Sequence, residues 1–449
     1  MAIGSGELKR KVVHVGVGSL ALLLRYLTWP QAAAMAAAAV LFNWQVLPRI
    51  GGRALWREAD HGAGYPLGIL LYPLSVLALV LALREERWMV AAVWGLLAVG
   101  DGMASIVGQA VGGPRLPWNA RKGWAGLVAF VAFGGVAAAL LSAWTLEMPL
   151  GAAASPWIVL VVAPLTVLCA LVESMPTTLD DNLTVPLVGG IAVALLARAD
   201  LALFLGDPGL PRRLALGLAL NLAIAVLAFL ARSIDLPGAV SAVVIGTAIT
   251  AGLGLSGLAV MIAFFVVGSA ATRVGYRVKA ERGIAQEKGG ARGWRNAWAN
   301  GAVPAALALL AGLVPPGERA LFALAYAASV ATAAADTCSS EVGKAYGRRT
   351  FLITTLRPVP AGTEGAVSAE GTAGGLVGAL LVAGVGAAAG LYGPGGAAMV
   401  ALAGLLGSLA ESVLGTVAER RGWLDNDLLN AVNTAIGAGL VVVMARLLA

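Results

Sequence analysis

The stretch GDGMASIVGQAVGG, residues 100–113, places an aspartate and five glycines at the end of a long apolar run. An apolar run of this kind is long enough to cross the roughly 30 Å hydrocarbon core of a bilayer as a helix. A carboxylate inside the bilayer costs about 2.5–3.5 kcal/mol on insertion scales, so its presence requires a reason. The stretch therefore predicts a membrane-embedded fold with a functional group near the membrane boundary.

The composition extends this prediction to the whole chain. Of the 449 residues, 59% are hydrophobic and 12% are charged, and the mean hydropathy is +0.85. A water-soluble core of this length could not bury so much apolar surface. Apolar runs recur along the chain, and a helix satisfies its own backbone hydrogen bonds in lipid. We therefore predict an all-α polytopic integral membrane protein with about 13–15 transmembrane helices in two fused halves. The two halves are residues 1–206 and 213–449, joined by a linker at 207–212 that is rich in turn residues.

The charged residues predict an orientation. The formal net charge is +7, and the excess Lys and Arg lie in short loops between apolar runs. Such loops remain on the cytoplasmic side of a membrane. We expect the lipid bilayer to be a partner of the chain and nucleic acid not to be one. We also expect a prokaryotic cytoplasmic membrane location, with the N-terminus and the active-site loops in the cytoplasm. The sequence does not indicate an oligomeric state.

The opening motif occurs twice. DGMASIVGQAVG at 101–112 aligns without a gap on DTCSSEVGKAYG at 336–347, and six of the twelve positions are identical. Each copy is followed by a Glu-Ser pair, at 173–174 and 411–412, and then by an acidic amide cluster, LDDNL at 179–183 or LDNDL at 424–428. The same order in both halves predicts a duplicated site.

The residue types in these motifs suit phosphoryl transfer. An aspartate followed four residues later by a hydroxyl places both groups on one helical face. The glycines allow a phosphate or another backbone to approach closely. Carboxylate and amide oxygens favour Mg²⁺, and nearby basic residues can balance phosphate charge. A kinase of this type would lack a P-loop, because GxxxxGK[ST] does not occur in the sequence.

We assign candidate residues by role. The candidate catalytic residues are Asp101, Glu173, Asp336 and Glu411. The candidate metal ligands are Asp101, Asp180, Asp181, Asn182, Asp336, Asp425 and Asn426. The candidate nucleotide- and phosphate-binding residues are Ser105, Gly108, Arg121, Lys122, Arg292, Arg295, Asn296, Ser340, Gly343, Lys344, Thr355, Arg357, Thr363 and Ser368. The residues alone leave structural roles open, because such acids also cap helices and such cations also mark topology or contact lipid headgroups.

Each half resembles a known enzyme family. Residues 1 to about 206 resemble the phytol kinase and dolichol kinase family, through RKVVH (10–14), GDGMASIVG (100–108), WNARKGWAG (118–126) and ESMPTTLDDNLTVPL (173–187). Residues from about 213 onward resemble the phytyl-phosphate kinase family, through RNAWANG (295–301), ASVATAAADTCSSEVGK (328–344), ITTLRPVPAGTEGAVS (353–368), GSLAESVLG (407–415) and DNDLLNAVNTAIG (425–437). Cys338 departs from this pattern, which has an aromatic residue there.

The resemblance implies a two-step kinase. The first family transfers a phosphoryl group from CTP to an isoprenoid alcohol, and the second phosphorylates the resulting isoprenyl monophosphate. We therefore expect conversion of geranylgeraniol or phytol to its diphosphate, with Mg²⁺ as cofactor and CTP as the nucleoside triphosphate. The preference for CTP comes from the resemblance only. A second hypothesis is a cytidylyltransferase that forms a CDP-lipid, because the KGWAG turn at 122–126 is also similar to CDP-diacylglycerol synthases. A third is a transporter built from duplicated halves.

Overall fold

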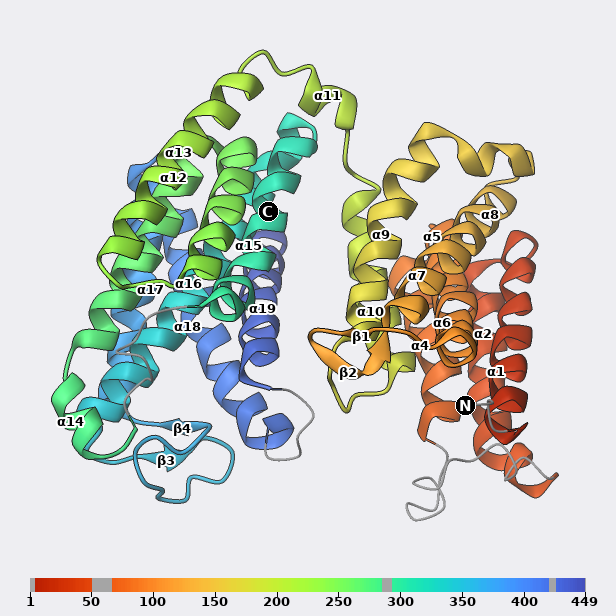
Figure 1. Cartoon of the computed structure of the whole chain (residues 1–449), viewed down its shortest axis with the longest axis horizontal. Helices are drawn as coiled ribbons and strands as arrows, with labels where there is room; N and C mark the ends of the chain where they lie inside the picture. The colour runs from red at the N-terminus through yellow and green to blue at the C-terminus, as the bar shows by residue number, and fades with distance from the viewer. Residues whose placement is uncertain (1–4, 51–66, 285–292, 420–424, 449) are drawn as a thin grey trace. The chain divides into compact units, whose positions relative to one another are not determined.

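The chain folds into two compact helical units in a computed structural model, which describes residues 5–50, 67–284, 293–419 and 425–448. Unit 1 comprises Met1–Arg198 and unit 2 comprises Ala199–Ala449 (Figure 1). The residues predicted as a linker, 207–212, lie within unit 2, where Arg213 donates a 2.7 Å hydrogen bond to Asp207. The boundary therefore falls several residues earlier than the turn-rich segment suggests.

Unit 1 consists of helices and one short hairpin. In chain order its elements are α1 (Ser5–Gly18), η1 (Ser19–Arg25), α2 (Trp29–Leu41), η2 (Phe42–Val46), η3 (Leu47–Arg49), α4 (Leu67–Leu83), α5 (Arg87–Gly95), η5 (Leu96–Gly100), α6 (Asp101–Val111), β1 (Arg115–Leu116), β2 (Asn119–Gly123), α7 (Trp124–Ala129), η6 (Phe130–Gly134), α8 (Gly135–Thr145), η7 (Leu150–Ala154), α9 (Pro156–Ser174) and α10 (Asp181–Leu196).

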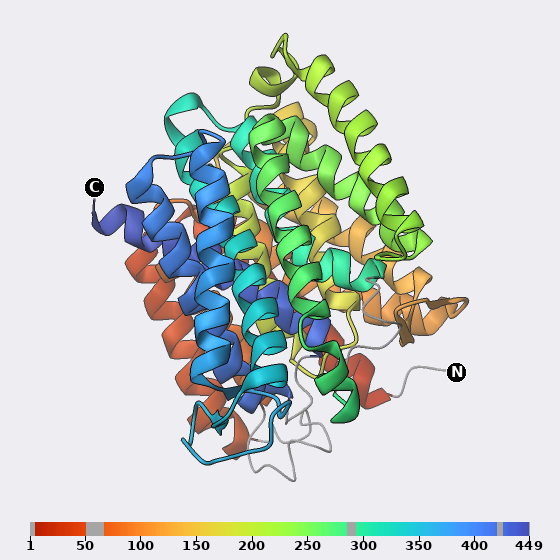
Figure 2. The ribbon, with the colours of Figure 1, turned by 90° about the vertical axis from the view of Figure 1, so that its left-hand side faces the viewer.

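Unit 2 has longer helices and a second short hairpin. Its elements are α11 (Leu201–Leu205), α12 (Leu210–Leu230), α13 (Leu236–Arg273), α14 (Tyr276–Glu281), α15 (Trp294–Leu313), α16 (Pro316–Tyr346), β3 (Phe351–Leu352), β4 (Ala366–Val367), α17 (Ala369–Ala388), α18 (Pro394–Leu414), η9 (Gly415–Glu419) and α19 (Asn426–Leu447). Figure 2 shows several of these long helices running side by side, with the β3–β4 hairpin at one end of the bundle.

The helical membrane fold predicted from the sequence is confirmed. Ten helices in the described residues are long and apolar enough to cross a membrane, and α4 and α10 are shorter apolar helices. The two apolar runs at 238–254 and 257–272 both lie in α13, which is broken at Gly254 by a backbone φ of 66°. The apolar run at 185–205 does not form one helix, because α10 stops at Leu196 and Asp200 caps the separate helix α11.

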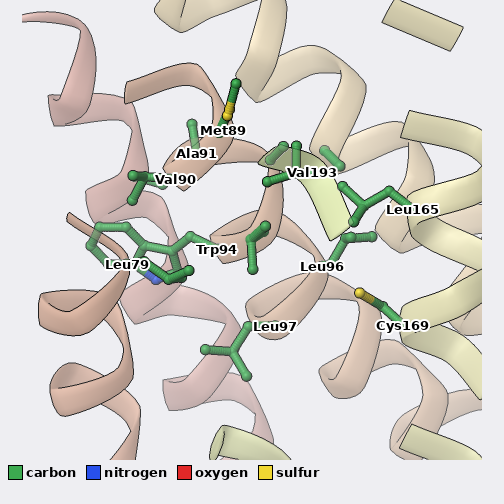
Figure 3. Packing of buried hydrophobic residues seen from close by; sticks show 14 of the residues in the cluster. Leu79, Met89, Val90, Ala91, Trp94, Leu96, Leu97, Leu165, Cys169 and Val193 are labelled. Carbon is green, nitrogen blue, oxygen red and sulfur yellow. The ribbon is translucent and has the colours of Figure 1, made fainter. Parts of the chain in front are cut away.

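The aspartate-bearing helices are the central helices of their units. The first is the continuous helix Arg87–Val111, which α5, η5 and α6 form. In its apolar stretch of 18 residues 72% of the residues are buried, and in that of α16 78% are buried. The other eight long helices have only 22–50% buried. Around the first central helix, large apolar side chains such as Trp94, Leu96 and Val193 interlock to form the core of unit 1 (Figure 3). Each repeated aspartate is therefore held on the most enclosed helix of its unit.

The two units repeat one arrangement of elements. In unit 1, α6 is followed by the β1–β2 hairpin, by the continuous helix that α7, η6 and α8 form, and then by α9 and α10. In unit 2, α16 is followed by the β3–β4 hairpin and then by α17, α18 and α19. Both hairpins are antiparallel and lie between long apolar helices.

A close helix crossing is repeated as well. A Cβ added to Gly126 of α7 would lie 2.9 Å from the carbonyl oxygen of Ala104, and one added to Gly371 of α17 would lie 2.7 Å from that of Ser339. Ala104 and Ser339 occupy equivalent positions in the repeated motif. Because both contacts are to backbone atoms, only glycine permits these crossings.

Candidate functional site

Unit 1 gathers three acids from three helices. Asp101 begins α6, Glu173 lies in the last turn of α9, and Asp181 begins α10. One carboxylate oxygen from each lies within 4.8 Å of the other two. Asp101 and Glu173 are buried, and Asp181 is partly buried. The sequence predicted all three as site residues, and the fold places them together.

The cluster fits a divalent cation. Magnesium holds its oxygen ligands at about 2.1 Å in an octahedron, so ligand oxygens lie about 3 Å apart when adjacent and about 4.2 Å apart when opposite. Oxygens within 4.8 Å of one another can therefore converge on one ion after small side-chain rotations. Carboxylate oxygens are also the ligand type that Mg²⁺ prefers.

Two lysines form ion pairs with the three acids of the cluster. Lys11 of α1 bonds both carboxylate oxygens of Asp101, at 3.0 and 2.9 Å. Lys122 of β2 lies 2.7 Å from Glu173 and 3.4 Å from Asp181. Burial alone would lower the pKa of Lys122, but the carboxylates of Glu173 and Asp181 outweigh it and raise that pKa above its usual value. Lys122 therefore remains charged beside these two carboxylates.

The hairpin is fixed to α9, which positions Lys122. The Trp118 indole donates a 3.0 Å hydrogen bond to the hydroxyl of Ser174. The Asn119 amide donates a 3.0 Å bond to the backbone oxygen of the same serine. Lys122 itself also bonds the backbone oxygen of Glu173. In unit 1 the Glu-Ser pair is thus the anchor of the hairpin, which gives Ser174 a positioning role.

The remaining predicted ligands of unit 1 lie outside the cluster. Asp180 is the N-cap of α10 and accepts a hydrogen bond from the backbone of Asn182. The Asn182 amide donates to Asp180 at 2.7 Å. These contacts explain why Asp181, and not its neighbour, joins the cluster: the helix begins at Asp181, so the two adjacent acids take different directions.

The predicted phosphate-binding residues of unit 1 are spread along α6 and the hairpin. Ser105 is partly buried, one turn after Asp101 on α6. Gly108 faces Gly126 at the close crossing with α7. Arg121 is exposed on the hairpin, where its backbone oxygen accepts a 3.3 Å bond from Arg115. Of this group, Lys122 alone contacts the acid cluster.

Unit 2 forms a polar pocket of about 190 Å³ at the hairpin end of its bundle. Its walls come from the end of α16, the β3–β4 segment, the start of α17 and the end of α18. Seven predicted site residues line it: Ser340, Gly343, Lys344, Thr363, Ser368, Glu411 and Asn426. Ser368 caps α17 by accepting a 3.0 Å bond from the backbone of Gly371. The positive end of the α17 dipole therefore faces the pocket, as in helix-terminal phosphate sites.

The two predicted catalytic acids of unit 2 meet beside this pocket. The carboxyl groups of Asp336 and Glu411 are hydrogen-bonded to each other, which brings α16 and α18 together. The same two helices are also in contact through Ser339 and Ser408, whose hydroxyl oxygens lie 3.3 Å apart. In the described part of unit 2, no third acid joins this pair to make a three-ligand cluster like that of unit 1.

Other predicted residues of unit 2 lie away from the acid pair. Asp425 caps α19 by accepting a 2.9 Å bond from Leu428. Arg295 lies 3.7 Å from Asp427. Asn296 lines a separate, mainly apolar cavity between α12, α13 and α15. Thr355 and Arg357 are exposed on the β3–β4 segment and do not line the pocket. Arg292 lies outside the described residues.

Sequence reasoning missed the partners that come from distant helices. Lys11 and His14 stand one turn apart on α1, and both reach Asp101, the His14 Nε2 at 3.3 Å. In unit 2, Lys279 forms a buried ion pair with Glu341 and also bonds the backbone oxygen of Thr272 at 2.8 Å. The motif RKVVH did contain a signal for Lys11 and His14, because it places these two polar residues on one helical face at the start of an apolar run.

Comparisons with known proteins agree with this architecture. The family model for the integral membrane protein DUF92 matches residues 219–438. An uncharacterized membrane protein of Synechocystis sp. is 44% identical over 200 residues, covering 44% of this chain and 78% of the relative. Protein VTE6, chloroplastic, of Arabidopsis thaliana is 37% identical over 234 residues, covering 50% and 70%. Phytol kinase 1, chloroplastic, of the same plant is 32% identical over 209 residues, covering 42% and 66%.

No solved structure matches the chain. The first two relatives are 44% and 37% identical to the chain, which covers 78% and 70% of their lengths. Ten of the described helices are also suited to crossing a membrane. The chain belongs to the DUF92 family of integral membrane proteins.

Proposed function

We propose that the chain is a membrane kinase that acts in two steps. Unit 1 would phosphorylate a long-chain isoprenoid alcohol, geranylgeraniol or phytol, and unit 2 would phosphorylate the monophosphate to the diphosphate. CTP would be the donor and Mg²⁺ the cofactor. The observation that carries the proposal is the convergence of Asp101, Glu173 and Asp181 within 4.8 Å, with Lys122 across them. The similarity to a phytol kinase supports the class of reaction and substrate.

The chemistry assigned to unit 1 is an in-line displacement. The alcohol oxygen attacks the terminal phosphorus of the nucleotide, a new oxygen–phosphorus bond forms, and the bond to the bridging oxygen breaks to release the nucleoside diphosphate. The hydroxyl proton passes to a carboxylate, for which buried Glu173 is our candidate. Bound Mg²⁺ would neutralise charge on the phosphates. Lys122 lies where it can transfer its contacts from carboxylates to phosphate oxygens.

The pocket of unit 2 supports an acceptor that already carries a phosphate. It combines the hydroxyls of Ser340, Thr363 and Ser368 with the cation of Lys344 and the N-terminus of α17. Hydroxyls, an ammonium group and free backbone N–H groups all donate to phosphate oxygens. The paired acids Asp336 and Glu411 stand beside these donors, as candidate metal ligand and base.

A product assay tests the proposal. Purified full-length protein is incubated with geranylgeraniol, Mg²⁺ and each nucleoside triphosphate in turn, and the lipid and nucleotide products are resolved by mass. We expect monophosphate followed by diphosphate, with CDP released from CTP. Pyrophosphate release with a CDP-lipid would instead establish the cytidylyltransferase hypothesis. Transport of the alcohol into vesicles without nucleotide turnover would remove the kinase assignment altogether.

A further inference from the structure

Unit 1 contains a second feature beside the acid cluster, a cavity of about 140 Å³ between α1, α4, α6 and α10. We propose that this cavity is the acceptor site, which holds the hydroxyl and first carbons of a long-chain primary alcohol. The inference rests on the proposed function for the identity of the reaction, but it gives an acceptor-binding role to residues for which the motifs indicate no such role. The polar residues that line the cavity include His14, Tyr72, Asp101 and Asn182, with Arg10, Lys11 and Asn43, and its apolar wall includes Val13 and Val17.

The polar floor of the cavity matches a hydroxyl group. Asn182 is 8% exposed, and its Oδ1 atom is buried without a hydrogen-bond partner among the described residues. The Tyr72 hydroxyl accepts a 2.9 Å bond from the Trp94 indole, so its own hydrogen is available to donate. An alcohol oxygen both donates and accepts one or more hydrogen bonds. It can therefore donate to Asn182 Oδ1 and accept from Tyr72, which satisfies a buried acceptor that is otherwise costly.

The cations that line the cavity do not make it an anion site. Lys11 lies at its edge, but both Asp101 oxygens already bond the Lys11 ammonium group. Arg10, the other cation of the lining, also has a partner within the structure. A phosphate placed here would meet the carboxylate of Asp101 and the bare amide oxygen of Asn182, which both repel negative charge. The floor favours an uncharged headgroup.

The mouth of the cavity is apolar and open. Val13 is 45% exposed and Val17 is 39% exposed, although both also line the cavity. Side chains that line a cavity and also face outward mark its opening. An opening between apolar side chains of a membrane protein gives access from the hydrocarbon region, where a long-chain alcohol dissolves. The headgroup can therefore enter sideways while the tail remains in lipid.

Asp101 connects this cavity to the acid cluster. Its carboxylate lines the cavity, where His14 Nε2 lies 3.3 Å away, and it also belongs to the cluster with Glu173 and Asp181. The His14 Nε2 atom lies 2.9 Å from the backbone oxygen of Leu97, which fixes the imidazole ring. An alcohol in the cavity and a nucleotide held at the cluster would thus both border Asp101, so the alcohol oxygen, the terminal phosphorus and Glu173 would meet at this residue. In-line transfer requires the acceptor oxygen next to the phosphorus and opposite the leaving group.

Photolabelling of the full chain tests the site without requiring turnover. The probe is a long-chain primary alcohol with a diazirine close to the hydroxyl, and labelled peptides are identified by mass. We expect labels on α1 and α4, displaced by geranylgeraniol but not by its monophosphate. Val13→Trp and Val17→Trp should each reduce labelling about tenfold, because the added ring fills the mouth. Val12→Trp is the matched control, since Val12 is 58% exposed on the same helix and does not line the cavity.

Steady-state kinetics of the same variants separate this inference from the proposed function. We expect Val13→Trp and Val17→Trp to raise KM for the alcohol about tenfold and to leave KM for the nucleotide unchanged. Turnover with normal alcohol KM in both variants would overturn the acceptor site and leave the kinase assignment intact. Labelling as expected in a protein that transfers no phosphoryl group would support the site and refute the kinase. Equal labelling in Val12→Trp and Val13→Trp, or displacement by the monophosphate, would also overturn the site.

Discussion

In unit 1, Lys11 and Lys122 lie directly against the three clustered carboxylates, whereas in unit 2 the buried lysine, Lys279, pairs with Glu341. Glu341 stands about one and a half turns along α16 from Asp336. Its equivalent in the repeated motif of unit 1 is Ile106, which carries no charge. The same succession of helices and hairpin thus holds two different arrangements of charge.

The two units differ in which lysine side chains pair with acids and which one lines a pocket where a ligand could bind. In unit 1 both lysines are committed to the acids until a ligand displaces them. In unit 2, Lys344 lines the polar pocket together with the start of α17, while Lys279 is committed to structure. Under the proposed function, the first arrangement suits a neutral acceptor and the second suits a phosphorylated acceptor. We therefore propose that the position of a few cations adapts each copy of the duplicated scaffold to its own acceptor.

The largest expected effect comes from removing each repeated aspartate. Asp101→Ala should lower alcohol phosphorylation about 10³-fold and leave conversion of added monophosphate unchanged, because the acids of the two units belong to separate sites. Asp336→Ala should have the reverse effect, so that monophosphate accumulates. Product ratios measured by mass spectrometry check both. Asp235→Ala is the control, since that aspartate only caps α13. Loss of both steps in either variant would mean that the sites are not separate.

The next largest effect concerns the buried Lys279–Glu341 ion pair, whose glutamate is replaced by Ile106 in unit 1. Lys279→Met leaves Glu341 charged and buried, and should destabilise the protein by about 3–5 kcal/mol. Lys279→Met combined with Glu341→Leu removes both charges and should recover most of that stability. Denaturant unfolding in detergent, followed by tryptophan fluorescence, measures both variants. If the double variant is as unstable as the single one, the lysine acts through its bond to Thr272 and not through Glu341.

A substitution of Lys122 can separate two effects of positive charge in unit 1: support of phosphoryl transfer, and competition with a metal ion for the carboxylates. Lys122→Met removes the cation that bridges Glu173 and Asp181, so alcohol phosphorylation should fall about 100-fold. Affinity of the protein for Mn²⁺ should rise at the same time, because the carboxylates then repel each other and a cation relieves that repulsion. Turnover assays and Mn²⁺ titration by electron paramagnetic resonance give the two values. Weaker Mn²⁺ binding in this variant would argue against a metal at the cluster.

The sequence predicted the duplicated acids because their spacing is local. The repeated motif, the Glu-Ser pair and the acidic amide cluster are each contiguous, and every one reaches the site region of its own unit. The sequence did not predict which acid of each motif caps a helix and which acid joins the cluster. Asp180 and Asp181 are the same residue type side by side, and only the first turn of α10 decides which one caps the helix and which one joins the cluster.

Contacts between distant helices carry no local pattern. Lys11 lies 90 residues before Asp101, and nothing in the spacing connects them. Asn296 shows a second dependence on tertiary packing: it was predicted from a polar residue in a basic segment, and α15 places it in the lining of a mainly apolar cavity, apart from the polar pocket of unit 2. The fold class was accessible from hydropathy, whereas the charge arrangement that distinguishes the two units depends on tertiary packing.

The smallest expected effect tests whether the shared helix crossing matters equally in both units. Gly371→Ala places a methyl group 2.7 Å from a backbone oxygen, and Gly126→Ala places one at 2.9 Å. Each should cost about 1–3 kcal/mol of unfolding free energy, with the larger cost at Gly371, because backbone atoms cannot turn aside. Gly384→Ala is the matched control on α17, since a methyl group there meets nothing within 4 Å and should stabilise the helix by about 0.5–1 kcal/mol. If all three variants are equally stable, the helices can move apart at little cost, and these glycines are not required for α7 and α17 to cross the aspartate-bearing helices.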